Sequence, residues 1–238
     1  MIHIFRREFF GYFRSPVAYV FLAVFVIASI GLTWLPGNFF DSNDASMQLF
    51  FTFIPWVYLF LIPAVGMRLW AEEKRSGTWE LLLTLPISTT QAVMGKFLAG
   101  LAFLAIALLC TFGLTLTTAY LGDPDWGPIF TGYIGCIFLS ASYLSICSLT
   151  SALTKSQVIS FVLGVTVCVT LLFLGWGQAN DFLISAGLPI AFVDSLANFS
   201  IIPHFEAMVK GLITLQDIVF FVSLSGFALF CNILILER

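Results

Sequence analysis

The residue types that most often carry chemistry are scarce in this chain of 238 residues. Its two histidines, His3 and His204, are too few and too far apart for a histidine-rich metal site. None of the five cysteines forms a C-x-x-C pair, and all lie in apolar runs, so they indicate small packing residues. They are Cys110, Cys136, Cys147, Cys168 and Cys231. We expect no disulfide, no metal site and no catalytic residue, and for His204 an interfacial structural role and a functional one stay equally open.

Two short patterns resemble parts of catalytic motifs but lack the residues that would complete them. The pair Glu72–Glu73 resembles the start of the glutamate motif of intramembrane CAAX-type proteases, but that motif has an arginine where Gly77 stands here. Gly95–Lys96 is followed by Phe97 and has no phosphate-binding glycines before it, so it is not a nucleotide-binding loop. The sequence therefore favours a protein without a nucleotide site of its own.

The most charged stretch, residues 68–91, lies between two long apolar runs and holds six of the 23 charged residues (10 basic and 13 acidic). Its middle predicts one short helix, because Ser76 or Thr78 can cap its start and Pro86 ends it. Residues 88–91, Ser-Thr-Thr-Gln, then have the form of a capping box for the next helix. A partner outside the membrane could move such a short helix. An ordinary solvated loop is the alternative, and spacing alone leaves both open.

Composition places the chain in a membrane. Sixty per cent of the residues are hydrophobic and 10% are charged, whereas soluble domains carry roughly 25% charged residues. Such a chain cannot cover itself with polar surface, so we expect an all-α integral membrane protein in contact with the lipid bilayer. The net charge of −3 says little about partners, and we expect no nucleic acid.

Long charge-free runs predict six transmembrane helices, because a span needs about 20 apolar residues. The expected spans are residues 16–35, 47–68, 97–121, 129–151, 157–176 and 217–236. Two shorter runs, 182–193 and 195–205, predict re-entrant or interfacial helices between the fifth and sixth spans. No span holds a charge at mid-depth, which argues against an ion relay through the membrane.

The basic residues predict the orientation. Residues 1–14 alternate arginines with apolar residues at helical spacing and predict an interfacial helix. The apolar run from Pro16 to Phe40 is longer than a cleavable signal sequence, so we expect an uncleaved first span. With the N-terminus inside, nine basic residues are cytoplasmic and only Lys210 is outside. Residues 69–96 and both termini are then cytoplasmic, and residues 177–216 lie outside.

The fourth predicted span is rich in glycine and serine. These small residues are Gly132, Gly135, Ser140, Ser142, Ser145, Ser148 and Ser151. They permit close approach of neighbouring helices. We favour this packing role over the alternative of a polar lining for a substrate.

The loop at residues 72–88 resembles the signature of type-2 ABC transporter permeases, E-x-x-x-G-T-x-E-x-L-x-x-x-P. The matching residues are Glu73, Gly77, Thr78, Glu80, Leu82 and Pro86. Two further segments, residues 151–161 and 200–217, resemble the branch that includes the gliding-motility-associated ABC permeases. The resemblance covers essentially the whole chain, and the loop motif is the most specific part of it.

This resemblance implies that the helix from Gly77 to Leu85 is a coupling helix that docks into a separate ATPase subunit. It also implies a second, smaller contact at the turn between the fourth and fifth spans. The residues implied are Glu73, Gly77, Thr78, Trp79, Glu80, Leu82, Leu83, Lys155 and Gln157. Within this set Glu80 would supply a charged contact and Trp79, Leu82 and Leu83 apolar ones.

The resemblance further implies a permease subunit of a bacterial cytoplasmic-membrane transporter, with export as the expected direction. The implied partners are two copies of an ABC ATPase, which would hold ATP and Mg²⁺, and a second copy of this chain or a related permease. An accessory membrane subunit with a large outer domain is a further implied partner. The alternative is a non-transporting membrane scaffold or assembly protein that binds a cytoplasmic partner. The sequence names no substrate.

Overall fold

The computed structural model describes residues 1–34, 46–78, 88–185, 189–190, 193 and 197–237, and the regular elements in these ranges are all α-helices. The predicted all-α fold is confirmed. The helices are α1 (Ile2–Arg14), α2 (Pro16–Trp34), α3 (Gln48–Gly66), α4 (Arg68–Ser76), α6 (Thr89–Cys110), α7 (Phe112–Leu121), α8 (Trp126–Leu153), α9 (Gln157–Phe173), α10 (Gly177–Ser185), α12 (Ile201–Val209) and α13 (Leu215–Leu236).

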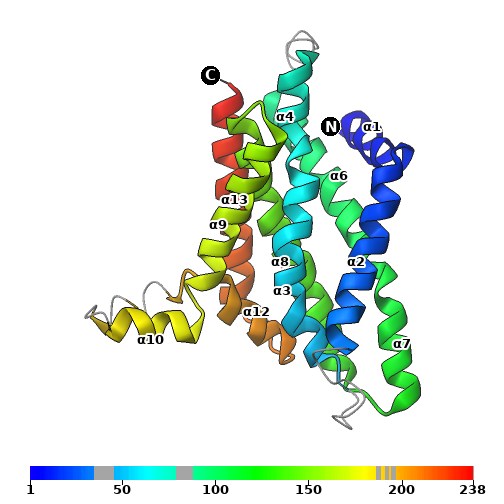
Figure 1. Ribbon diagram of the computed structural model, residues 1–238, viewed down its shortest axis with the longest axis vertical. Helices are drawn as coiled ribbons and strands as arrows, with labels where there is room; N and C mark the ends of the chain where they lie inside the picture. Colours follow the sequence, from blue (N-terminus) through cyan, green and yellow to red (C-terminus); the bar gives the residue numbers. More distant parts are fainter. Residues whose placement is uncertain (35–45, 79–87, 186–188, 191–192, 194–196, 238) are drawn as a thin grey trace.

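Helix α8 forms the centre of the bundle, with α3, α4, α6, α9, α12 and α13 packed around it (Figure 1). Of the most apolar 18 residues of α8, 72% are buried, whereas the corresponding share is 28% in α2 and in α13. Small residues permit this packing: a Cβ added at Gly66 of α3 would collide with Cys147 of α8. A Cβ at Gly132 would lie 2.6 Å from the ring of Phe51. The seven small residues predicted to pack in the fourth span are all buried.

Five helical stretches among the described residues are long and apolar enough to cross a membrane. They are Pro16–Trp34, Gln48–Ser76, Thr89–Leu121, Trp126–Leu153 and Leu215–Leu236. Helix α9, with 17 residues, is at the lower limit of length for a span. Helix α1 and the last turn of α13 lie at the same end of the bundle, here called the α1 end, and α12 lies near the opposite one, the α12 end (Figure 1). The count of six spans and their bounds stay predictions.

The region predicted as one span at residues 97–121 consists of two helices that meet at Thr111. The hydroxyl of Thr111 donates to the carbonyl of Leu108 at 2.6 Å, and its backbone N–H donates to the same carbonyl at 3.1 Å. This tight turn interrupts the regular ladder. At the other end of α6, Ser88 accepts a hydrogen bond from the backbone N–H of Gln91 at 3.2 Å, which is the serine half of the predicted capping box.

The structure corrects the prediction that a loop follows residue 68. Helix α4 continues beyond α3 as far as Ser76, because Leu69, Trp70 and Ala71 are buried in the bundle. Ser76 therefore ends a helix and does not cap the start of one; its hydroxyl donates back to the carbonyl of Glu72 at 2.9 Å. Gly77 follows with a φ of 74°, a left-handed conformation that glycine adopts without strain. The predicted helix from Gly77 to Leu85 lies outside the described residues except for Gly77 and Thr78.

The segment between α9 and α13 contains helices, but with bounds that differ from the apolar runs 182–193 and 195–205. Helix α10 begins at Gly177 and extends sideways from the bundle (Figure 1), and α12 begins at Ile201. The side chain of Ser200 accepts a hydrogen bond from the N–H of Ile202 and so fixes the start of α12. The interfacial or re-entrant position of these helices stays a prediction.

Candidate coupling site

Helix α4 is held against α8 at its first turn. The hydroxyl of Ser151 accepts hydrogen bonds from the backbone N–H groups of Trp70 and Ala71, each at 3.0 Å. It also donates to the carbonyl of Met67 at 2.9 Å. The first N–H groups of a helix have no partner within that helix. Here a serine from another helix supplies the partner, so the junction of α3 and α4 is tied to α8.

Two further contacts fix α4 to the bundle. The indole N–H of the fully buried Trp70 donates to the hydroxyl of Ser148 at 3.0 Å, and the amide of Asn232 on α13 donates to the same hydroxyl at 2.6 Å. The ammonium of Lys74 donates to the carbonyl of Ala152 near the end of α8. Helix α4 thus forms one unit with α8 and α13 and is not a flexible tether.

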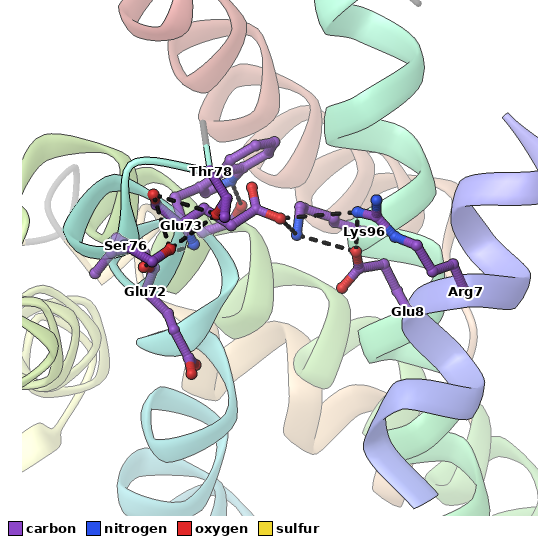
Figure 2. Close-up of polar contacts among 11 residues, drawn as sticks. Arg7, Glu8, Glu72, Glu73, Ser76, Thr78 and Lys96 are labelled. Atoms are coloured by element: carbon purple, nitrogen blue, oxygen red, sulfur yellow. Dashed lines mark hydrogen bonds and ion pairs between the residues drawn. The ribbon is translucent and has the colours of Figure 1, made fainter. Parts of the chain in front are cut away.

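Four charged side chains from three helices meet beside α4 (Figure 2). This charge cluster consists of Arg7 and Glu8 on α1, Glu73 on α4 and Lys96 on α6. The Lys96 ammonium lies 2.8 Å from Glu73 Oε1 and 3.2 Å from Glu8 Oε1. The guanidinium of Arg7 lies 2.6 Å from Glu8 Oε1 and 3.8 Å from Glu73 Oε1. The cluster therefore joins α1, α4 and α6.

Three of the four side chains of the charge cluster are largely withdrawn from solvent, and that of Arg7 is 56% exposed. The side chain of Lys96 is 3% exposed, that of Glu73 is 17% exposed, and that of Glu8 is 21% exposed. The Lys96 ammonium also lies 5.2 Å from the centre of the Trp70 ring, a distance at which an aromatic face attracts a cation. Burial raises the pKa of Glu8, but the charges of Lys96 and Arg7 lower it by more, so the net pKa lies below its ordinary value. The carboxylate is thus ionised at neutral pH.

The two neighbouring glutamates of α4 have different roles. Glu73 joins the charge cluster, while the exposed side chain of Glu72 points away from it (Figure 2). One oxygen of Glu73, Oε2, is buried and accepts no hydrogen bond from the residues that the structure describes. The Oε2 atom of Glu73 can therefore accept a further hydrogen bond.

The predicted coupling residues fall into three groups. Glu73 lies in the charge cluster, and Gly77 and Thr78 lie just beyond α4, where the Thr78 hydroxyl is hydrogen-bonded to that of Ser76 at 2.8 Å. The second group lies outside the described residues: Trp79, Glu80, Leu82 and Leu83.

The third group, Lys155 and Gln157, lies at the turn between α8 and α9. Lys155 is exposed, and its positive charge acts on that of Lys74 near the end of α4. The structure therefore places this turn beside α4. Two parts of one docking surface must lie next to each other in this way. A docking role for either part stays a prediction.

Sequence reasoning missed Arg7, Glu8 and Lys96 as site residues: it used the basic ones as markers of orientation and rejected Gly95–Lys96 as a nucleotide-binding loop. The sequence contained one indication of this site, because Lys96 follows Gly95 inside a helix that is otherwise mostly apolar. A Cβ at Gly95 would lie 2.9 Å from the side chain of Ile4, so this glycine lets α1 approach α6 closely. Among the described residues no three His, Cys, Asp or Glu side chains could hold a metal ion. The arrangement is suited to transmitting force between helices.

The fold and the site define a multi-pass helical membrane protein in which one charged helix is fixed to the bundle core. Residues 21–235 match the family model described as ABC-2 family transporter protein, so the chain belongs to that family. The chain is 29% identical over 164 residues to the probable ABC transporter permease protein NosY of Stutzerimonas stutzeri. It is 28% identical over 191 residues to the protein of the same name in Pseudomonas aeruginosa.

These matches cover 60% and 71% of this chain but only 57% and 66% of the two relatives. The resemblance to type-2 ABC permeases is confirmed by the family match. The finer resemblance to gliding-motility-associated permeases is not tested by these findings and stays a prediction.

Proposed function

We propose that this chain is the membrane permease subunit of an ATP-driven ABC transporter, and that α4 and the segment after it couple a separate ATPase to the helices. The observation that carries the proposal is the position of Glu73, a residue of the signature-like motif. It does not lie on a free loop but pairs with the buried Lys96 at 2.8 Å. A load on the residues that follow Gly77 would therefore reach the bundle directly.

The coupling would work through a rigid connection. The serine contacts join α4 to α8, and the charge cluster joins it to α6 and α1. A push on the coupling segment would move these helices together, because bending at the α3–α4 junction would break the hydrogen bonds of Ser151. The free Oε2 of Glu73 could accept a new donor during the movement without first losing another one.

The proposal includes the partners that such a subunit needs. Two ATPase copies would bind ATP and Mg²⁺, and a second copy of this chain or a related permease would complete the translocation path. An accessory membrane subunit with a large outer domain would join at the opposite side. The name ABC transporter permease, given to the relatives in S. stutzeri and P. aeruginosa, supports the permease assignment. Export is the proposed direction, and the bacterial inner membrane is the proposed location.

Charge reversal and apolar disruption in the coupling segment test the function. In Glu80→Lys and Leu82→Asp the protein should reach the membrane at normal abundance, because both residues lie beyond the predicted spans. Co-purification of the ATPase should fall by tens to thousands of fold, since a disrupted interfacial pair costs about 2–5 kcal/mol. Glu206→Lys, a charge reversal in the exposed part of α12, is the matched control and should retain the ATPase.

If both coupling variants retain the ATPase and full transport-coupled ATP hydrolysis, the coupling function is wrong. A membrane protein that binds a cytoplasmic partner but loses no ATP-dependent activity on these changes would instead be a scaffold.

The orientation is tested by single cysteines at Ser76 and Ser185 in a cysteine-free background. With the α1 end in the cytoplasm, an impermeant maleimide should label the cysteine at position 185 in intact cells. It should label the one at position 76 only after lysis. The reverse pattern would overturn the proposed orientation.

A further inference from the structure

A cavity of about 390 Å³ lies at the α1 end, between α1, α2, α6 and the α3–α4 junction. Its lining changes from charged to apolar along the helices: Lys96 and Phe103, seven residues apart on α6, both border it. That separation corresponds to about 10 Å along a helix axis. Phe21 of α2 also lines the apolar part, and Val17, at the edge, is 49% exposed. The cavity thus opens on the protein surface where α1 meets α2.

The charges that line this cavity balance one another. Two are cations, Arg68 and Lys96, and two are anions, Glu8 and Glu72. Lys96 and Glu8 are paired at 3.2 Å. Arg68 and Glu72 lie one turn apart on α4 and are exposed, and neither forms an ion pair within the part of the chain that the structure describes. Two charges of opposite sign, those of Arg68 and Glu72, therefore remain unpaired at the charged end of the cavity.

We propose that this cavity binds a zwitterionic glycerophospholipid of the phosphatidylethanolamine type. The Arg68 guanidinium binds the headgroup phosphate, and the Glu72 carboxylate binds the ammonium. The first part of the acyl chains lies against Phe21 and Phe103. The cavity volume is in the range of small-molecule sites, roughly 300–1,000 Å³, and so holds the headgroup with the start of the chains.

The chemistry of the lining selects this class of lipid. A guanidinium presents a planar set of donors that matches a phosphate, and an ammonium is the natural partner of a carboxylate. A lipid with an uncharged glycerol headgroup satisfies Arg68 but leaves the charge of Glu72 unpaired. Soluble phosphoethanolamine satisfies both charges but leaves the apolar part of the cavity empty. The site therefore prefers a zwitterionic headgroup that is attached to acyl chains.

Native mass spectrometry of the full chain in detergent tests the proposal, with phosphatidylethanolamine and phosphatidylglycerol of identical acyl chains added in competition. The wild-type protein should retain one phosphatidylethanolamine molecule with at least a tenfold preference over phosphatidylglycerol. Glu72→Gln should reduce that preference about tenfold, whereas Arg68→Ala, which removes the ligand of the phosphate that both lipids share, should reduce the retention of both lipids about tenfold. Arg75→Ala, which removes an exposed arginine of the same helix that does not line the cavity, should leave the preference and the retention unchanged.

Two further experiments test whether the headgroup alone is enough for binding and whether binding needs the free volume of the cavity. Phosphoethanolamine alone should fail to compete at lipid concentrations; equal competition by it would overturn the lipid assignment. Ala18→Leu, which adds bulk to a buried lining residue, should lower lipid retention even if the headgroup residues are intact. Retention that is the same in wild type, Arg68→Ala, Glu72→Gln and Ala18→Leu would overturn the site.

Discussion

Two groups of polar side chains, one at each end of the bundle, differ in what they connect. At the α1 end, the charge cluster joins three helices through residues that are far apart in the chain. At the α12 end, His204 and Asp217 form a pair with Nδ1 and Oδ1 2.7 Å apart, which joins α12 to the start of α13. Both groups fix a short helix to a long one, but only the first one crosses the bundle.

The pair at the α12 end is completely satisfied by local partners. Asp217 Oδ2 accepts from the N–H and the hydroxyl of Thr214, at 3.2 and 2.7 Å, in a capping box. The Nε2 of His204 faces the carbonyl of Asn198 at 3.3 Å, and its ring stacks on Phe220 with 4.2 Å between centroids. In contrast, Glu73 keeps a buried oxygen without a partner among the described residues. The complete hydrogen-bond network at the α12 end fixes the junction of α12 and α13. The charge cluster, whose hydrogen bonds between helices are incomplete, can rearrange.

The largest expected effect comes from removing the central cation of the charge cluster. Lys96→Met leaves Glu8 and Glu73 facing each other, with only the half-exposed Arg7 to balance them. Loss of one partner of a buried pair costs about 3–5 kcal/mol, so the free energy of unfolding should fall by that amount. Thermal unfolding in detergent measures it. ATPase co-purification should fall as well, because α4 loses its link to α6.

A matched substitution gives the control for this prediction. Lys210→Met removes the partner of Glu206 in a surface pair at 3.6 Å whose side chains are 60% and 59% exposed. Such pairs contribute about 0–1 kcal/mol, so this variant should melt close to wild type. The double variant Lys96→Met with Glu73→Gln should regain part of the lost stability, since it removes one unpaired charge. Equal melting temperatures for Lys96→Met and Lys210→Met would contradict the buried cluster.

The sequence alone predicted the parts of this comparison that depend on local patterns. Apolar runs gave the class, and the spacing of Ser88 and Gln91 gave the start of α6. The charge cluster could not be predicted, because Lys96 meets Glu8 and Glu73 only through the packing of α1 and α4 on α6. Four charged residues in a row, from Glu72 to Arg75, lowered the hydropathy of α4 and suggested a loop. Its helical structure depends on distant serines of α8, which a single sequence does not pair with it.

A smaller effect is expected at the α12 end. Asp217→Asn keeps the shape of the cap but replaces the charged acceptor of His204, so the free energy of unfolding should fall by about 1–3 kcal/mol. The ATPase should still co-purify, because the change lies at the end of the bundle opposite α4. Melting temperature and pull-down together measure the two outcomes. If Asp217→Asn released the ATPase while Lys96→Met retained it, the assignment of coupling to the α1 end would be wrong.

The smallest effect, and the one most specific to the charge cluster, is a dependence of stability on pH through Glu8. Its pKa in the folded protein lies below the ordinary value, because Lys96 and Arg7 outweigh the effect of burial. A lowered pKa in the folded state stabilises the protein above the pKa of the unfolded chain, about 4.3, and this stabilisation is lost as the pH falls through the folded value.

The melting temperature of wild type should therefore exceed that of Glu8→Gln by a constant amount between pH 8 and about pH 5. The difference should shrink as the pH falls below about 4 and disappear once the pH is below the folded pKa, because Glu8 is then protonated and as neutral as glutamine. A difference that grew as the pH fell would mean that Glu8 does not stabilise the cluster as a carboxylate. Glu206→Gln, in the exposed pair, is the control and should differ little from wild type throughout.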